Sequence, residues 1–347
     1  MRTIVTGGAG FIGSHLVDHL LRAGDEVVVL DDMSTGSPRN LLDSLVDPRL
    51  TIVHGSVLDR RLLLETIRGA DRVFHLAAAV GVKLIVDHPL TSLRVNIHGT
   101  ENVLDACGET GAALLLVSTS EIYGKNTSDR LHENSDRVLG SPLRSRWTYA
   151  AAKGIDEAFA HAYWSEHGLD VTIVRPFNTV GPRQTGRYGM VVPNLVGQAL
   201  RGEPLTVYGD GDQTRCFSYV GDVVPAMVRL LEEPSATGDA FNLGGAEEVS
   251  INSLARRVIR VTGSSSDVVH VDYADAYAAG FEDMRRRVPD YSKAAALVGF
   301  DPATHLDEII RRVADDLRSD RSRDGAGLPA TVGRPAAVGH PAPVGHP

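Results

Sequence analysis

Short apolar runs alternate with longer amphipathic stretches along most of the chain. The runs TIVTG, EVVVLDD, LTIVHG, RVFHLA, ALLLVST and DVTIVRP are rich in β-branched and aliphatic residues, and each has the length of one strand. FIGSHLVDHLLRAG, LLLETIRG, residues 90–109 and residues 149–167 lie between them and have helical spacing. Strands that alternate with helices pair in parallel, and strands that are apolar throughout are covered on both faces. The pattern predicts a Rossmann-type, doubly wound parallel α/β sheet.

The pattern changes after residue 178. Residues 178–190 are rich in Gly and Arg and indicate a loop, and helices are expected near 193–201, 250–262 and 306–317 with a strand near LTVYG. VGDVVPAMVRLLE and AFNLGG indicate a return to the first sheet. We therefore assign residues 1–178 and 218–245 to the sheet domain, and residues 179–217 and 246–318 to a smaller, discontinuous α/β lobe. Residues 319–347 end in VGRPAAVGHPAPVGHP, which cannot form a core, and are predicted to be disordered.

Composition narrows the class of protein. A net charge of −9 and a pI of about 5.8 argue against a broad nucleic-acid surface. The two cysteines, Cys107 and Cys216, lie in apolar surroundings and form no CxxC pair, so we expect buried thiols and neither a metal site nor a disulfide. The chain starts directly with a strand, and no apolar run reaches the ~18 residues of a membrane span. We expect a cytoplasmic protein without a membrane partner.

A glycine fingerprint follows the first strand. Gly8-Ala9-Gly10-Phe11-Ile12-Gly13 has the spacing GxGxxG, opens a helix and is preceded by Gly7. Such glycines permit a tight turn and close approach of a pyrophosphate to the helix amino terminus. Asp31 ends the second strand, where a carboxylate can accept ribose hydroxyls and repel a 2′-phosphate. The sequence therefore favours NAD over NADP.

A second group of polar residues follows the ALLLV strand and opens the next helix. Ser118, Thr119, Ser120 and Glu121 end the strand, and Tyr149 and Lys153 have the i, i+4 spacing of one helix face. A lysine ammonium beside a phenol is expected to lower its pKa, which would make Tyr149 a base near neutral pH.

The whole set resembles the extended short-chain dehydrogenase/reductase family, in particular its nucleotide-sugar epimerases, dehydratases and decarboxylases. The similar segments are TGGAGFIG, HLAA, STSEIYG, YAAAK, RPFNTVGPR and RCFSYVGDVV. The resemblance implies a bound NAD, a UDP-sugar substrate and a homodimer that pairs through residues 90–109 and 147–167. It implies that the following residues contact the cofactor: Gly7, Gly10, Phe11, Ile12, Gly13, Asp31, Asp32, Ser56, Val57, Leu76, Ala77, Ala78, Asn96, Ser118, Tyr149, Lys153 and Pro176.

The smaller lobe would then hold the nucleotide-sugar. The resemblance implies substrate contacts from Asn178, Val191, Pro193, Thr206, Tyr208, Arg215 and Arg287. Arginine forks match phosphate and carboxylate oxygens, and Arg287 is the member of the Arg285–Arg287 run that we assign to the site.

The reaction depends on the residues after Thr119. In this family Tyr149 and Thr119 would act at the sugar C4 hydroxyl. The 4,6-dehydratases of the family have an Asp-Glu pair after the threonine, and the 4-epimerases usually lack the glutamate. Ser120 and Glu121 instead resemble the UDP-glucuronate decarboxylases, whose chemistry would use Ser120, Glu121 and Arg287 beside C5 and C6. The segment at residues 79–89 is nearer to an epimerase loop. A 4-epimerase and a non-catalytic NAD-binding protein therefore stay open as alternatives.

Overall fold

The computed structural model describes residues 1–80, 89–144, 147–186, 189–273 and 284–325. Its centre is a seven-stranded sheet with the strand order β11-β6-β5-β4-β1-β2-β3. Every neighbouring pair is parallel. The strands are β1 (Arg2–Thr6), β2 (Glu26–Asp31), β3 (Leu50–His54), β4 (Arg72–His75), β5 (Ala113–Val117), β6 (Val171–Pro176) and β11 (Ala240–Leu243). This confirms the predicted α/β class.

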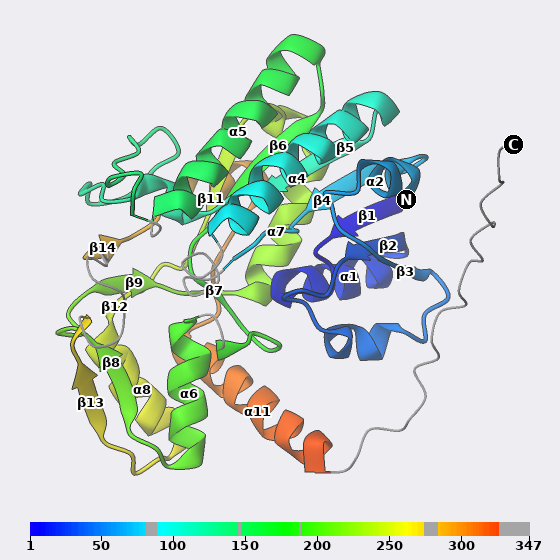
Figure 1. The fold of residues 1–347 in the computed structure, drawn as a ribbon. Coiled ribbons are helices and arrows are strands. Elements are labelled where there is room, and N and C mark those ends of the chain that lie inside the picture. The colour runs from blue at the N-terminus through cyan, green and yellow to red at the C-terminus, as the bar shows by residue number, and fades with distance from the viewer. Residues whose placement is uncertain (81–88, 145–146, 187–188, 274–283, 326–347) are drawn as a thin grey trace, which may run out of the picture.

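Helices cover both faces of the sheet (Figure 1). One face packs against α1 (Phe11–Ala23) and α7 (Val220–Glu232), and α10 (Ser292–Val298) packs against α7. The other face packs against α2 (Arg60–Ile67), α4 (Pro89–Thr110) and α5 (Thr148–His167). The chain enters the smaller lobe after β6 and then returns to the sheet, where α7 packs on one face and β11 forms an edge strand.

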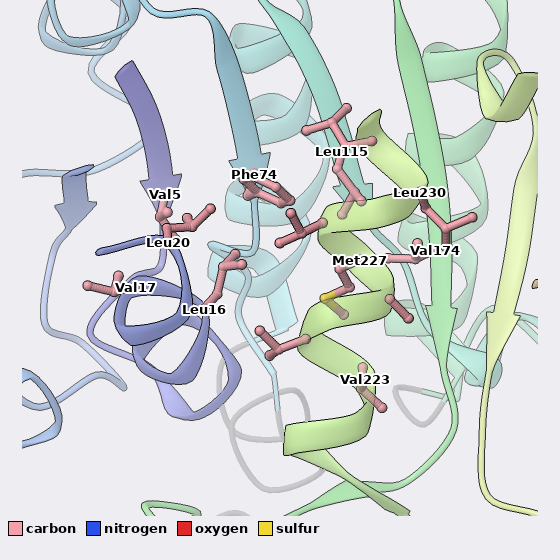
Figure 2. Packing of buried hydrophobic residues seen from close by; sticks show 14 of the residues in the cluster. Val5, Leu16, Val17, Leu20, Phe74, Leu115, Val174, Val223, Met227 and Leu230 are labelled. Carbon is pink, nitrogen blue, oxygen red and sulfur yellow. The ribbon is translucent and has the colours of Figure 1, made fainter. Parts of the chain in front are cut away.

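The alternation of side chains along each strand builds two separate cores. Val5 and Leu115 belong to the core under α1 and α7, whereas the adjacent Ile4 and Leu114 belong to the core under α2, α4 and α5. Successive residues of a strand point to opposite faces, so an all-apolar strand needs helices on both sides. Figure 2 shows the first of these cores, with Leu16 and Met227 pointing from α1 and α7 toward the strands.

The smaller lobe has its own apolar core. Helices α6 (Val191–Arg201), α8 (Ile251–Thr262) and α11 (Leu306–Gly325) pack around it. Strand β8 (Leu205–Tyr208) pairs with β13 (Val268–Val271), and β9 (Thr214–Cys216) lies between β12 (Glu248–Ser250) and β14 (Arg286–Arg287). Two short strands, β7 (Thr179–Val180) and β10 (Ser218–Tyr219), form a parallel pair where the chain passes between the sheet and this lobe.

One boundary expectation is wrong. Disorder was expected from residue 319, but α11 continues to Gly325. Just before the expected boundary, Arg318 pairs with Asp315 one turn earlier in the helix at 2.9 Å. The remaining tail, 326–347, and the loop at 81–88 lie outside the described residues.

Both cysteine thiols are free and buried, as expected, and burial raises the pKa of each to about 12.

Candidate functional site

A cavity of about 1000 Å³ lies at the carboxyl ends of the sheet strands and extends to the smaller lobe. Its lining includes Gly7 and Thr119, which follow β1 and β5, and Val191 and Tyr208 from the smaller lobe. The chain order of the sheet reverses between β1 and β4, because β2 and β3 lie on one side and β4 to β6 on the other. Ligands of doubly wound sheets bind at this type of switch point.

The glycine turn fits a dinucleotide. Gly7 has φ +72°, and a Cβ there would lie 2.7 Å from the backbone nitrogen of Ala77. A Cβ on Gly13 would lie 2.2 Å from the carbonyl oxygen of Gly7. Helix α1 starts at Phe11, so its first-turn N–H groups and positive dipole end lie at the cavity, where they suit a pyrophosphate. Only glycine permits this turn, because a larger residue would collide with the neighbouring backbone.

Asp31 fixes the turn from the end of β2. Its carboxylate accepts the backbone N–H of Ala9 at 2.9 Å and that of Met33 at 2.8 Å, and its side chain is largely buried. Burial raises the pKa of Asp31, although the two N–H donors oppose the shift. Asp32 also lines the cavity but is exposed. The carboxylate that was assigned to the adenosine ribose therefore also has a structural role.

The other expected cofactor residues follow the same edge of the sheet, with one exception. Those that line the cavity are Gly10, Phe11, Ile12, Gly13, Ser56, Val57, Leu76, Ala77, Ala78, Ser118, Tyr149, Lys153 and Pro176. Ser118 Oγ is buried and makes no hydrogen bond among the described residues, which leaves it available to a ligand group. Asn96 does not line the cavity. It is fully buried, and its amide oxygen accepts the Ala79 N–H at 2.9 Å, so it holds the loop after β4 instead.

The Thr119 hydroxyl and the Tyr149 phenol lie in contact, as expected from the sequence. The pKa of Tyr149 is raised, however, where a lowered pKa was expected. Thr119 lies at the amino end of η2 (Ser120–Tyr123), and its hydroxyl is hydrogen-bonded to Tyr149. Burial raises the pKa of Tyr149, the charges of Glu121 and Asp156 raise it further, and the Thr119 hydrogen bond opposes the rise. Lys153 Nζ lies 3.2 Å from a carboxylate oxygen of Asp156, a partner that the spacing argument did not consider.

Arg287 and Glu121 form an ion pair in the same cavity. Nη1 of Arg287 lies 2.8 Å from Oε1 of Glu121, and Nη2 donates to Oδ1 of Asn178 at 2.6 Å. Asn178 has φ +40° and also donates to the carbonyl of Cys216 at 2.8 Å. All three side chains line the cavity. Ser120 is buried at the cavity wall between Thr119 and Glu121.

Arg286 and Arg287 point to opposite faces of β14, because successive side chains of a strand alternate. Arg286 projects to the surface and pairs with Glu248, whereas Arg287 is 7% exposed and lines the cavity. Arg215 on β9 lies directly in register with Arg287 on β14 and also lines the cavity. Two arginine side chains that line one cavity suit an anionic ligand, because guanidinium forks match phosphate and carboxylate oxygens.

The smaller lobe contributes side chains from α6 and β8 to the cavity lining. Val191 and Pro193 come from the first turn of α6, and Thr206 and Tyr208 come from one face of β8. Sequence reasoning missed Arg183 and Asp316, which also line the cavity. The Arg183 N–H donates to Asp316 at 2.7 Å, and its guanidinium lies 2.8 Å from Asp18. Nothing in the sequence pattern distinguished Asp316 from the other acidic residues of α11.

The chain belongs to the NAD-dependent epimerase/dehydratase family, whose family model matches residues 3–244. A UDP-N-acetyl-alpha-D-glucosaminuronate decarboxylase from Bacillus cytotoxicus is 39% identical over 87% of this chain and 92% of its own. UDP-glucuronic acid decarboxylase 1 from Xenopus tropicalis is 36% identical over 92% of this chain and 72% of its own. The predicted family and its NAD cofactor are therefore confirmed.

Solved structures agree with this family at the level of the fold. A UDP-glucose 4-epimerase from Thermotoga maritima with UDP-glucose has a TM-score of 0.83 and 30% identity, and covers 92% of this chain and 100% of its own. A dTDP-glucose 4,6-dehydratase from Streptomyces venezuelae with NAD bound has a TM-score of 0.84 and 31% identity, and covers 93% of this chain and 98% of its own. The fold alone therefore does not separate the three reactions.

None of the helices in the described part of the chain has the length and apolar character needed to cross a membrane. Within the same part of the chain, no cluster of three or more His, Cys, Asp or Glu side chains could hold a metal ion.

Proposed function

We propose that the protein is an NAD-dependent UDP-glucuronate decarboxylase that yields UDP-xylose or releases the 4-keto pentose. The observation that carries the proposal is the Glu121–Arg287 pair, which lies in the same cavity as the hydrogen-bonded Thr119 and Tyr149. An epimerase needs no carboxylate at that place, and a dehydratase needs a stronger acid than the Ser120 hydroxyl. The curated relatives named decarboxylase support this choice.

In the proposed reaction Tyr149 and Thr119 act at C4 of the sugar, and the carboxyl group is lost from C5. Tyr149 takes the proton of the C4 hydroxyl as its phenolate, and Thr119 holds the same oxygen. The positive charge of a bound nicotinamide would favour this phenolate and oppose the burial that raises the pKa of Tyr149. When bound, NAD supplies a hydride acceptor at C4. The C6 carboxylate is then β to a ketone, so the C5–C6 bond breaks, CO₂ leaves and the electron pair enters an enolate between C4 and C5. A proton from water added at C5 gives the 4-keto pentose. Return of the hydride to C4 and of the Tyr149 proton to its oxygen then gives UDP-xylose, and release before that return gives the 4-keto sugar.

Arg287 and Glu121 suit the C5–C6 end. The Arg287 fork binds a carboxylate well, and its Nε is buried with no hydrogen-bond partner among the described residues. Glu121 would lie beside the substrate carboxylate, where like charge favours its departure as neutral CO₂, and Ser120 would donate a hydrogen bond to it. Arg215 and the α6–β8 end of the cavity would hold the diphosphate and the nucleoside.

Incubation with UDP-glucuronate tests this proposal. We expect release of CO₂ and a UDP-pentose, measured by trapped ¹³CO₂ and mass spectrometry of the nucleotide pool. Conversion to UDP-galacturonate without change of mass would replace the proposal with a 4-epimerase. If no UDP-sugar reacts while NAD is retained, the chain is a non-catalytic NAD-binding protein.

A second substrate deserves a parallel assay. The Bacillus cytotoxicus relative is named for a 2-acetamido uronate, which differs from glucuronate only at C2. The decarboxylation chemistry proposed here acts at C4 to C6 and is the same for both sugars. The ratio of kcat/KM for UDP-glucuronate and UDP-N-acetylglucosaminuronate decides between them, and a ratio below one would assign the acetamido sugar.

The homodimer and the cytoplasmic location stay predictions. Helices α4 and α5 pack against each other on one face of the sheet, and α5 exposes Ile155 and Trp164. Pairing of these helices between two copies would cover those side chains. Light scattering is expected to give about twice the chain mass of 37.2 kDa, and a monomer would contradict the expectation.

A further inference from the structure

Helix α5 carries a buried carboxylate that no step above uses. Asp156 lies three residues after Lys153 and seven after Tyr149, so all three share one helix face. Asp156 is fully buried and Lys153 is 1% exposed, and their charged atoms lie 3.2 Å apart. A buried charge is costly unless it is paired, so each of these residues compensates the other.

The surroundings of Asp156 extend from α5 to the dinucleotide turn. The Thr100 hydroxyl on α4 lies beside the carboxyl and favours its ionised form, against the burial that raises the pKa of Asp156. Thr100 Oγ1 lies 3.1 Å from Nε2 of His75, and Nδ1 of His75 lies 2.7 Å from Oγ1 of Thr6. The Ala77 N–H, at the cavity wall, donates to the same Thr6 hydroxyl at 3.3 Å. These contacts connect the catalytic helix to the loop that approaches Gly7.

The charge of this network is confined to the Asp156–Lys153 pair. Burial and the nearby Lys153 lower the pKa of His75 to about 3, so its imidazole is neutral at physiological pH. Other ionisable groups near the pair include Glu157 on the same helix and Glu121 from η2, which acts on Tyr149. The Arg137 guanidinium also packs on this helix, against Gly154, and donates to the Ala150 carbonyl at 3.2 Å. Glu157 is engaged by Arg175 at 2.6 Å and Glu121 by Arg287 at 2.8 Å. Asp156 is therefore the carboxylate that directly partners Lys153.

We propose that Asp156 is a positioning residue that fixes the Lys153 ammonium at the cavity wall and places a negative charge behind the catalytic tyrosine. The proposal rests on the proposed roles of Tyr149 and Lys153 but not on the identity of the sugar. A fixed ammonium has one direction of approach to a ligand, whereas a free lysine side chain has many rotamers. The nearby carboxylate makes the neutral phenol more favourable, so Tyr149 loses its proton at higher pH than it would without Asp156.

The first test is the pH dependence of UDP-glucuronate turnover in Asp156→Asn. Removing the carboxylate favours the phenolate, so the acid limb of the kcat/KM profile is expected to move to lower pH by roughly 0.5–1 unit. Glu166→Gln removes an exposed carboxylate from the same helix and is the matched control, with a profile like that of the unaltered protein. An Asp156→Asn profile that superimposes on the control would overturn the proposal.

A second test needs no substrate and so separates failure of this inference from failure of the proposed function. Unfolding in urea is measured for Lys153→Met, Asp156→Asn and the double variant. If the two residues compensate each other, the double variant loses less stability than the sum of the two single variants. Recovery of soluble protein in the double variant supports the same conclusion if Asp156→Asn alone fails to fold. Strictly additive losses, or no recovery, would show that the ion pair has no positioning role.

Discussion

Nη1 of Arg287 lies 2.8 Å from Oε1 of Glu121, although 166 positions separate the two residues in the sequence. Glu121 lies in η2, shortly after the central strand β5 of the sheet, and Arg287 comes from the edge strand β14 of the smaller lobe. The contact therefore exists only when both lobes are folded together. The pair lines the same cavity as Tyr149 and, in the proposed mechanism, lies beside the sugar carboxylate.

Replacement of Arg287 tests whether this arginine binds the carboxylate of the sugar, and replacement of the adjacent Arg286 controls for the loss of a positive charge. In Arg287→Ala we expect kcat/KM for UDP-glucuronate to fall by about 30-fold or more, because truncating one partner of a buried charge pair costs roughly 2–5 kcal/mol. Arg286→Ala removes the adjacent surface arginine and should change kcat/KM by less than about twofold. Steady-state CO₂ release measures both variants, and equal losses would contradict the assignment.

The Glu121 carboxylate is expected to act in CO₂ loss and not in cofactor retention. Glu121→Gln keeps the side-chain shape, so we expect CO₂ release to fall by roughly 10²–10⁴-fold while NAD stays bound. NAD released on denaturation of the purified protein measures its occupancy. Glu248→Gln alters the neighbouring surface pair with Arg286 and serves as the control. Full activity in Glu121→Gln would remove this residue from the mechanism.

Asp31 should control the choice between NAD and NADP. In Asp31→Asn the negative charge that would face a 2′-phosphate is lost, and one of two N–H contacts to the turn is lost with it. We expect the affinity for NAD to fall and the preference for NAD over NADP to shrink by about tenfold, measured by calorimetry. A larger shift in Asp32→Asn than in Asp31→Asn would assign the ribose contact to the exposed neighbour.

Asp25, at the amino end of the sheet, is expected to make the stability of the folded state depend on pH. Burial alone would raise the pKa of Asp25, but hydrogen bonds from Arg72 and Thr3 outweigh it and hold the pKa below its usual value of 3.8. A carboxyl whose pKa is depressed on folding stabilises the folded state above the unfolded-state pKa, and that contribution is lost as pH falls through the folded-state pKa.

Urea unfolding at several pH values checks this contribution. We expect the unaltered protein to lose stability as pH falls below about 4, and Asp25→Asn to be less stable at pH 7 but to show a weaker dependence in that range. Asp43→Asn, an exposed site, is the control and should follow the unaltered protein. A slope below pH 4 that is unchanged in Asp25→Asn would assign the dependence to other carboxyl groups.

Local patterns in the sequence determined the parallel sheet, the glycine turn and the Tyr149–Lys153 helix face. Side-chain alternation, the need for glycine beside crowded backbone and the i, i+4 spacing of a helix are properties of short segments. They are the same in any tertiary context, so they can be read from the chain directly. The likeness of Ser120 and Glu121 to decarboxylases was visible for the same reason.

Only the tertiary structure decided which groups set the charges around these residues. The spacing of Tyr149 and Lys153 suggested a lowered tyrosine pKa, but the folded chain buries Tyr149 near Glu121 and Asp156 and raises it. Asn96 turned inward to Ala79, and Arg287 rather than Arg286 entered the cavity. Burial and long-range ion pairs depend on segments that are far apart in the sequence, so no local pattern could determine them.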